Sequence, residues 1–200
     1  MTEHPLKPHW TFSYQNYDNW EYVDIVHVYT VEQFWMAVDD TRPQYIPTPS
    51  TFMQVVGSLE RRRFVKPVNT VRSFSFHRGD ITMKWEDPNN NGSFMADIPN
   101  ITATQIDHIW EVLLLQAIGG IEYGDTLRAL RVADKGKGKG NNCSVCILIE
   151  AWCKHADRGV QETLNKVLRD QGSMSHLHGN CLSKRIPDGK SPYLFWKILF

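Results

Sequence analysis

The feature that most constrains the fold is one long helical pattern near the middle of the chain. Residues Thr102-Ala-Thr-Gln105 form a capping box, in which a threonine hydroxyl and a glutamine side chain satisfy two backbone N–H groups at a helix start. Gly119-Gly120 is a typical helix end. Between them, apolar residues recur at helical spacing: Ile106, Ile109, Trp110, Leu113, Leu114, Ala117 and Ile118. This apolar stripe has to pack against another layer of structure.

Strand-like segments on both sides of this helix predict that the other layer is a β-sheet. Apolar alternation or short apolar runs predict strands over 23–29, 71–77, 81–85, 94–98, 126–133, 143–149 and 193–200. Two further helices are expected, one opened by a capping box at Thr30-Val-Glu-Gln33 and one over 158–171. We therefore expect an α+β fold, in which about eight largely antiparallel strands carry three helices on one face. The other face is left open for a ligand.

Length and charge narrow the range of functions. The chain has 200 residues, which predicts a single domain over 1–200, and its 22 Lys+Arg balance 22 Asp+Glu. This balance excludes a highly basic nucleic-acid coat but not a locally basic site. No run approaches 18 apolar residues and the first residues carry no apolar signal region, so we expect no membrane span and a cytoplasmic or nuclear location.

Residues 41–70 form an unusual connection. They contain four prolines and the basic run Arg61-Arg62-Arg63, and they predict a long loop with one short helix near 50–58. A connection of this length inside a small domain is usually functional or mobile.

The most informative candidate site combines Trp85-Glu86, at the end of a predicted strand, with Trp20 from another loop. Two indoles can sandwich a flat ring, and a carboxylate beside them can accept the N1–H and amine donors of guanine. A positively charged guanine would stack more strongly through cation–π attraction, by about 2 kcal/mol where water is excluded. The alternative is that both tryptophans belong to the core and Glu86 is a solvated turn residue.

A basic segment follows on a later strand and its loop. Arg128, Arg131, Lys135, Lys137 and Lys139 would suit a phosphate chain, although these residues alone favour a solvated basic loop. The glycines here lead into a strand, so the segment is neither a P-loop nor a dinucleotide-binding fingerprint.

The cysteines and histidines near the C-terminus raise a third possibility, a zinc protein. The candidate ligands are Cys143, Cys146, Cys153, His155, His176, His178 and Cys181. Residues i and i+3 of a strand point to opposite faces, so Cys143 and Cys146 are better explained as buried thiols than as zinc ligands. We expect no metal or cofactor. With no nucleophile elbow and no His-Glu-x-x-His motif, we expect a binding protein rather than an enzyme.

Taken in order, these segments resemble the eukaryotic translation initiation factor 4E family, which binds the 7-methylguanosine cap of mRNA. The matching pieces are His4-Pro5-Leu6, Trp10, Trp20, Val31-Glu-Gln-Phe-Trp35, Met83-Lys-Trp85-Glu86-Asp87, Asn91-Gly92, Asp107-His-Ile-Trp110, Leu114-Leu115 and Ile118-Gly119. The resemblance implies a curved sheet with three helices on its convex face. It also implies that Trp20 and Trp85 sandwich the base and that Glu86 accepts its N–H groups.

The resemblance leaves the phosphate-binding residues open. If Leu130 and Val132 face the core, Ala133 takes the family's arginine position and Lys135 its lysine position, whereas a small shift of register brings in Arg131. The candidates are therefore Arg128, Arg131, Lys135 and Lys137. The indole that contacts the methylated side of the base in the family falls near Leu148 here, and Trp152 or Trp196 could replace it.

The convex face resembles the family's docking surface for 4G-type scaffold factors and small repressors. The residues expected to bind a partner helix are Pro5, Val31, Trp35, Val112 and Leu115. Glu111 and Val112 exchange the family's apolar-then-acidic order. The resemblance therefore implies a monomeric factor that recruits mRNA for initiation, with a cap-binding repressor or competitor as the alternative. The long connection between Trp35 and Trp85 is similar to insertions in divergent kinetoplastid homologues.

Overall fold

The computed structural model describes one main sheet and its helices. It covers residues 3–16, 21–39, 46, 48–52, 55–56, 63–64, 71–84, 87, 90, 92–99, 101–119, 125–134, 146–155, 157–170, 181–185 and 196–197. Across the sheet the order is β10 (Trp196–Lys197), β9 (Cys181–Arg185), β6 (Gly92–Pro99), β8 (Cys146–Cys153), β7 (Leu127–Asp134), β5 (Val71–Arg78), β1 (Pro5–Asn16) and β2 (Tyr22–Thr30). Each neighbouring pair is antiparallel. The expected α+β class is confirmed.

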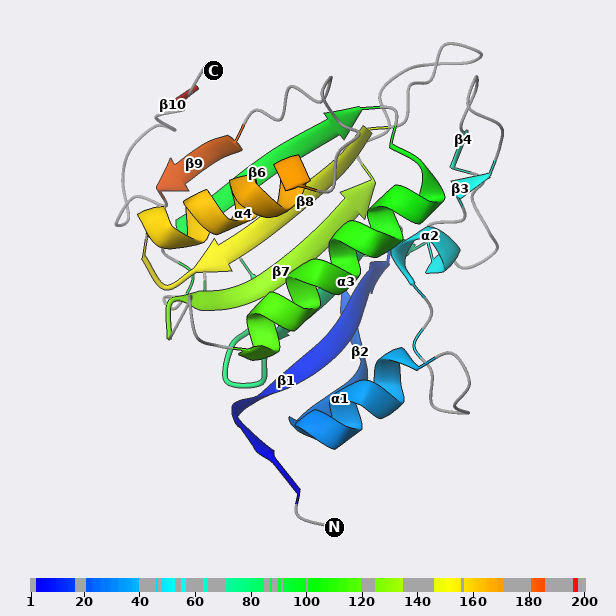
Figure 1. The fold of residues 1–200 in the computed structure, drawn as a ribbon, viewed down its shortest axis with the longest axis vertical. Coiled ribbons are helices and arrows are strands. Elements are labelled where there is room, and N and C mark those ends of the chain that lie inside the picture. Colours follow the sequence, from blue (N-terminus) through cyan, green and yellow to red (C-terminus); the bar gives the residue numbers. More distant parts are fainter. Residues whose placement is uncertain are drawn as a thin grey trace.

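The helices lie together on one face of this sheet (Figure 1). They are α1 (Val31–Val38), α3 (Ala103–Gly119) and α4 (Arg158–Asp170), with a four-residue helix, α2 (Pro49–Phe52), beside α3. A small separate pair is formed by β3 (Val55–Val56) and β4 (Arg63–Phe64). Within the described part of the chain, no helix is both long enough and apolar enough to cross a membrane.

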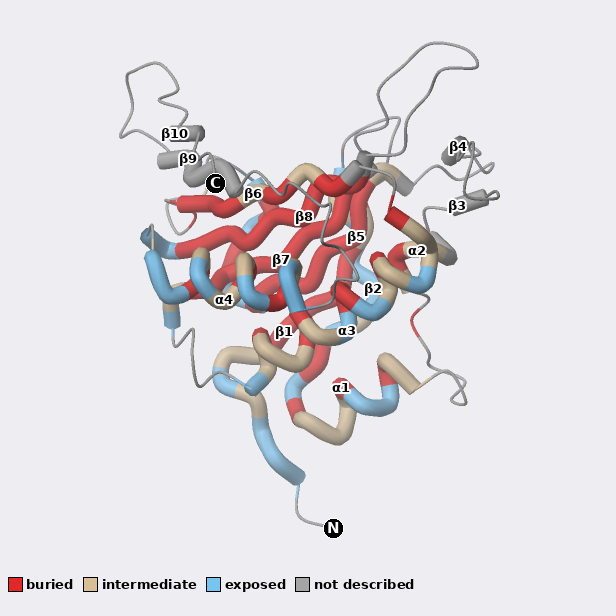
Figure 2. Tube along the Cα trace, turned by 45° about the horizontal axis from the view of Figure 1, so that its top comes forward, coloured by how far each residue is buried: buried red, intermediate tan, exposed pale blue. Residues whose placement is uncertain are grey.

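The hydrophobic core lies between the helices and the sheet. Figure 2 shows that the central strands of the sheet are almost entirely buried. Alternate strand residues such as Phe12, Phe74 and Phe76 point into it and are almost fully buried. The predicted stripe of α3 packs against them, and Ile106 and Ile109 are completely buried. Each such side chain contributes about 1.5–3 kcal/mol on burial, so the core sets which face of every strand looks away from the helices.

The predicted capping box of α3 is present in full, and that of α1 is present in part, because Gln33 bonds to the residue before the N-cap Thr30. Thr30 Oγ1 accepts a hydrogen bond from the Gln33 backbone N–H at 3.2 Å, and Gln33 Oε1 accepts one from the Tyr29 N–H. At α3, Thr102 Oγ1 accepts from the Gln105 N–H and Gln105 Oε1 accepts from the Thr102 N–H, at 3.0 and 2.9 Å. Each box therefore places the start of its helix where the sequence predicts it.

Several sequence-based expectations are corrected. β1 was not expected, because Pro5 and Pro8 interrupt its pattern; the alternation of Trp10, Phe12 and Tyr14 is its signal. Residues 81–84 form bends rather than a strand. The strand expected over 143–149 is β8 (Cys146–Cys153), and α2 ends at Phe52 rather than near residue 58.

Some expectations fall mainly outside the described residues. This applies to most of the segment 41–70 and to most of the strand expected over 193–200, of which Trp196–Lys197 is described.

Candidate functional site

The face of the sheet that looks away from the helices, called here the open face, is polar. Thr11, Ser13, Ser75 and His77 alternate with the core phenylalanines of β1 and β5, and all four are buried. The Ser13 and Ser75 hydroxyls are hydrogen-bonded at 2.8 Å, and Thr11 Oγ1 lies 2.9 Å from His27 Nδ1. Because buried polar groups are costly unless paired, these bonds fix the side chains of the open face in place.

A row of polar side chains, called here the polar row, crosses four strands of this face. Arg131 on β7 lies at its centre. Its Nη1 donates to Glu150 Oε2 on β8 at 2.6 Å, its Nη2 to Gln15 Oε1 on β1 at 3.0 Å, and its Nε to Ser73 Oγ on β5 at 3.0 Å. Arg131 and Glu150 are 8% and 2% exposed, so this is a buried ion pair whose other polar groups are also bonded.

Burial and the charges of the polar row shift the pKa values of Arg131 and of the neighbouring Tyr22. Burial alone would lower the pKa of the Arg131 guanidinium, but the attraction of Glu150 and Tyr22 and the Glu150 hydrogen bond outweigh it and raise that pKa. Burial also raises the pKa of the Tyr22 phenol, with Arg131 and a hydrogen bond to Ser73 opposing the rise. Arg131 therefore stays charged, and the Arg131–Glu150 pair is neutral as a whole.

An apolar cluster adjoins the polar row on the open face. It contains Ile81, Met83, Ala129 and Trp152, with the partly buried Tyr22 packed against it. Trp152 is 1% exposed, and its indole N–H donates to Glu150 Oε2 at 3.3 Å. We call this set the second cluster, because it lies apart from the core beneath the helices.

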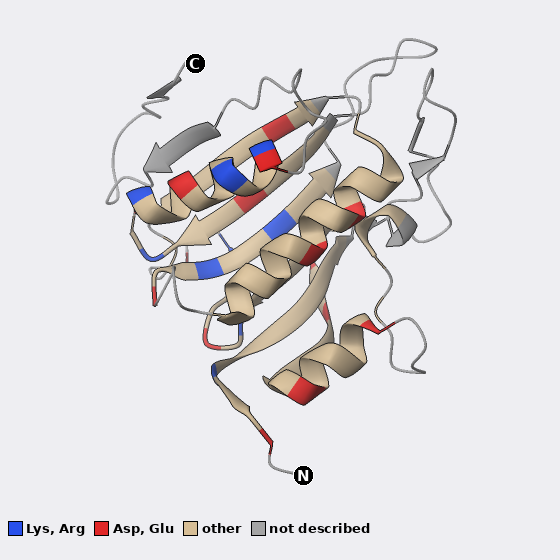
Figure 3. Cartoon of the chain, viewed as in Figure 1, with Lys and Arg blue, Asp and Glu red and all other residues tan. Residues whose placement is uncertain are grey.

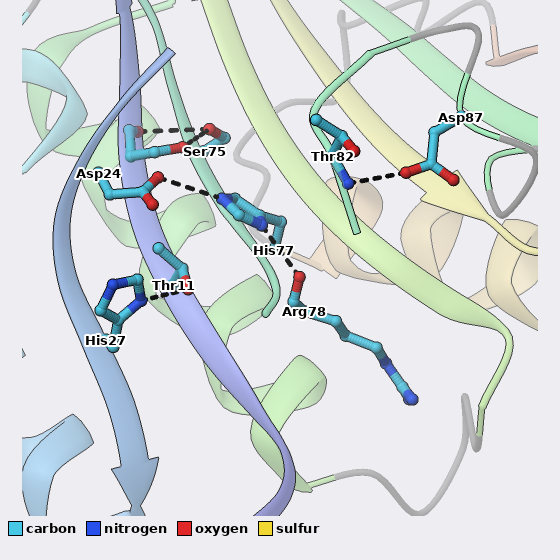
Figure 4. Close-up of polar contacts among 9 residues, drawn as sticks. Thr11, Asp24, His27, Ser75, His77, Arg78, Thr82 and Asp87 are labelled. Carbon is cyan, nitrogen blue, oxygen red and sulfur yellow. Dashed lines mark hydrogen bonds and ion pairs between the residues drawn. The ribbon is translucent and has the colours of Figure 1, made fainter. Parts of the chain in front are cut away.

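The side chains of Asp87 and Asn90 hold the turn that follows Ile81, the first as a hydrogen-bond acceptor and the second as a donor. Asp87 Oδ2 accepts from the Thr82 N–H at 2.7 Å (Figure 4). The Asn90 amide donates to the carbonyl oxygens of Thr82 and Lys84 at 3.1 and 3.0 Å, and Asn90 is 1% exposed. These bonds bracket positions 85 and 86, and they explain why 81–84 bend instead of forming a strand.

The predicted base-binding residues Trp20, Trp85 and Glu86 themselves lie outside the described residues. Their chain neighbours are described. Trp20 comes two residues before Tyr22 and Trp85 two residues after Met83, and both neighbours belong to the second cluster.

The predicted phosphate-binding residues are placed in part. β7 carries two basic positions, and β8 beside it carries the acidic Glu150 (Figure 3). Arg128 lies at an irregularity in the β7–β8 register and forms an ion pair with Asp80 at 3.4 Å. Lys135 and Lys137 lie outside the described residues.

The register of β7 is now defined. Leu130 and Val132 face the core, so Arg131 and Ala133 lie on the open face. Under the resemblance, Ala133 then occupies the family's arginine position. Leu148 and Trp152 are both buried, and the Trp152 indole belongs to the second cluster.

On the opposite face, a cavity of about 810 Å³ opens between α1 and α3. We call it the α1–α3 groove. Its lining includes Trp35, which is 49% exposed, together with Leu114 and Leu115. Asp107 and Glu111 also line it, so the groove combines apolar walls with acidic groups.

The other residues of the predicted partner surface lie close to this groove. Pro5 pairs with Thr30, which places it beside Val31 at the start of α1. The segment is pinned there by His4, whose backbone N–H and Nδ1 lie 3.0 and 2.6 Å from the Glu32 carboxylate. Val112 is partly buried against the core and does not line the groove.

The residues described in the structure contain no group of His, Cys, Asp and Glu side chains that could hold a metal ion. Cys153 is buried, and burial raises the pKa of its thiol to about 12. Of the candidate zinc ligands, only Cys153 and His155 have described side chains.

Sequence reasoning missed the polar row and the second cluster. Glu150, Gln15 and Ser73 carry no motif, and each bonds across the sheet rather than along the chain. The alternation of serine and phenylalanine in Ser73-Phe-Ser-Phe76 is the one local signal of a polar open face.

Comparison with known proteins agrees with this architecture. No protein-family model matches the sequence, and no curated protein matches it. Among solved structures, Ascaris suum eIF4E-3 with an m7G cap is 16% identical, with a TM-score of 0.63 and 96% of each chain covered. C. elegans eIF4E-3 with the 4E-binding protein Mextli is 19% identical, with a TM-score of 0.61, and covers 90% of this chain and 93% of that one.

A schistosome eIF4E in complex with m7GpppA and 4E-BP is similar as well. It is 20% identical, with a TM-score of 0.55, and covers 93% of this chain and 90% of that one. The chain therefore has the fold of eIF4E cap-binding proteins, with the curved sheet and the helices on its convex face that the resemblance implies. The resemblance to kinetoplastid homologues stays a prediction.

Proposed function

We propose that this protein binds the 7-methylguanosine cap of mRNA on its open face. The observation that carries the proposal is the second cluster, which contains Met83 and against which Tyr22 packs. Each lies two residues in sequence from a tryptophan of the predicted pair, so one cluster would support both segments that close on a base. Solved structures with this fold include complexes with an m7G cap and with m7GpppA.

The base would stack between Trp20 and Trp85 while Glu86 accepts its N1–H and amine groups. Stacking is worth about 1–3 kcal/mol per base, and the positive charge of a 7-methylated guanine adds cation–π attraction. The bonds of Asp87 and Asn90 to the backbone of 82–84 would hold the turn that bears Trp85 and Glu86 before the ligand arrives. A turn ordered in advance loses less entropy on binding.

The cap phosphates would meet the basic residues of β7 and the segment after it, and of the four candidates we assign this role to Arg128, Lys135 and Lys137. The guanidinium of the fourth, Arg131, already donates to Glu150, Gln15 and Ser73. A fall in affinity with added salt would mark these contacts.

The convex face would bind a protein partner. The α1–α3 groove offers Trp35 and Leu115 to the apolar side of a helix, and its acidic groups would attract basic residues on that helix. Pro5, Val31 and Val112 would extend the contact. We propose that a 4G-type scaffold docks there, so that this monomeric, cytoplasmic factor recruits mRNA for initiation.

Two single substitutions test the two faces separately. Trp85→Ala should reduce affinity for 7-methyl-GTP about 5- to 150-fold, the value of one stacked base, and leave capture of the partner from cell extract unchanged. Trp35→Ala should reduce capture of the partner and leave the affinity for 7-methyl-GTP unchanged, because Trp35 lies on the opposite face. If Trp85→Ala left the 7-methyl-GTP affinity intact, the assignment of the base site would be wrong.

The second candidate function is a cap-binding repressor or competitor, favoured by the exchanged order of Glu111 and Val112. Capture from cell extract separates the two. A scaffold factor that is captured by the wild-type protein and lost with Trp35→Ala supports recruitment. A wild-type protein that binds 7-methyl-GTP but captures no scaffold factor supports repression.

A further inference from the structure

We propose that Trp152 and the polar row act as positioning elements for the proposed base site, because they hold the start of β2 and residues 81–84 in place. In this arrangement Arg131 joins neighbouring strands of the base site through its hydrogen bonds and is not a ligand of the phosphates. The inference rests on the proposed cap-binding function and assigns new roles within that site.

The first support is the path of the hydrogen bonds. From Ser73 on β5, one bond leads to Gln15 on β1, whose backbone partner in β2 is Tyr22. In the other direction, Arg131 on β7 leads to Glu150 on β8. The polar row therefore links the start of β2 to β7 and β8 across the sheet.

The second support is the position of Trp152. Its indole N–H bonds to Glu150 Oε2, the same oxygen that accepts from Arg131. Its ring packs in the second cluster with Met83 and Tyr22. One buried side chain, which is 1% exposed, thus connects the polar row to Met83 and to Tyr22 at the start of β2.

The third support is the electrostatic state of Arg131. A phosphate-binding arginine supplies net positive charge, but the charge of Arg131 is already matched by a carboxylate 2.6 Å away. The three bonds that Arg131 makes to protein groups come from three different strands. This arrangement fixes the strands relative to one another and adds little to the attraction of an anion.

The test measures the affinity of the full chain for two ligands by calorimetry. These are 7-methyl-GTP and the nucleoside 7-methylguanosine, which has the same base and no phosphate. Arg131→Gln and Trp152→Phe should each lower the affinity for both ligands by the same factor, at least about tenfold, because both substitutions disturb the base site. A loss confined to 7-methyl-GTP in Arg131→Gln would make Arg131 a phosphate ligand and overturn the proposal.

Trp110→Phe is the matched control. Trp110 is a tryptophan of similar burial, 3% exposed, but it packs in the core beneath the helices. Trp110→Phe should change both affinities by less than about twofold. An effect equal to that of Trp152→Phe would mean that Trp152 acts only as an ordinary core residue, which would overturn the proposal.

Amide hydrogen exchange without any ligand separates failure of this inference from failure of the proposed function. Trp152→Phe should speed exchange at residues 21–24 and 81–84 at least about tenfold, and Trp110→Phe should not. If the wild-type protein bound neither ligand while this exchange pattern was observed, cap binding would be refuted and the link between the loops would stand. Unchanged exchange in Trp152→Phe would refute the link itself.

Discussion

Replacing Glu150 by glutamine is the perturbation whose effect follows most directly from the structure. Glu150 is 2% exposed and is the acceptor for Arg131 Nη1 at 2.6 Å and for the Trp152 indole N–H at 3.3 Å. The substitution keeps the size of the side chain and removes its charge. Arg131, at 8% exposure, is then a buried cation without a counter-charge.

Breaking a buried pair in this way costs about 3–5 kcal/mol, far more than the 0–1 kcal/mol of a surface pair. For a domain of about 150–250 residues, each kcal/mol lowers the melting temperature by about 2–4 °C, so Glu150→Gln should lower it by about 6–20 °C. Urea unfolding followed by far-UV circular dichroism measures the free energy of unfolding directly.

The double variant Arg131→Met/Glu150→Leu is the companion measurement. Replacing both charges by apolar groups of similar size is often neutral, so the double variant should regain most of the stability that Glu150→Gln loses. A loss below about 1 kcal/mol for Glu150→Gln would mean that the pair behaves as a surface ion pair. The reasoning about the polar row would then be wrong.

Three further predictions concern other parts of the molecule. Thr102→Ala removes the hydroxyl that accepts from the Gln105 N–H and should lower the free energy of unfolding by about 1 kcal/mol in urea; no change would mean that the cap is not formed in solution. Hydrogen bonds from His4 hold the pKa of Glu32 at about 2, so the contact between His4 and Glu32 should persist at pH 4.5 and be lost as the pH falls toward 2; a Glu32 carboxyl that titrates by NMR near 4.5 would contradict this. Burial raises the thiol pKa of Cys153 to about 12, so iodoacetamide at neutral pH should leave Cys153 unmodified in the folded protein by mass spectrometry, and rapid labelling would refute its burial.

Local signals in the sequence predicted the helical layer well. The capping boxes at Thr30 and Thr102 involve residues three apart, so α1 and α3 could be located from short stretches of chain. The apolar stripe of α3 then indicated that this helix packs against another layer, which the strand-like segments predicted to be a sheet. β1 was missed because Pro5 and Pro8 obscured a real alternation.

The open face could not be predicted from the sequence in the same way. Arg131 and Gln15 are 116 residues apart along the chain and meet only because β1, β5 and β7 are neighbours in a particular register. Arg131 was a candidate phosphate ligand because of its charge and its place on a strand before a basic loop, and nothing local in the sequence indicates the Glu150 carboxylate beside it. The bends at 81–84 depend on Asp87 and Asn90, whose hydrogen bonds no periodicity reveals.

The measurement that tests the central claim most directly is calorimetric titration of the wild-type protein with 7-methyl-GTP and, in parallel, with GTP. Cap recognition predicts saturable binding of one equivalent of 7-methyl-GTP, at least about tenfold tighter than GTP, because cation–π attraction of about 2 kcal/mol acts only on the methylated base. Equal affinity for the two nucleotides, or no binding of either, would contradict the claim that the open face of this sheet is a cap-binding site.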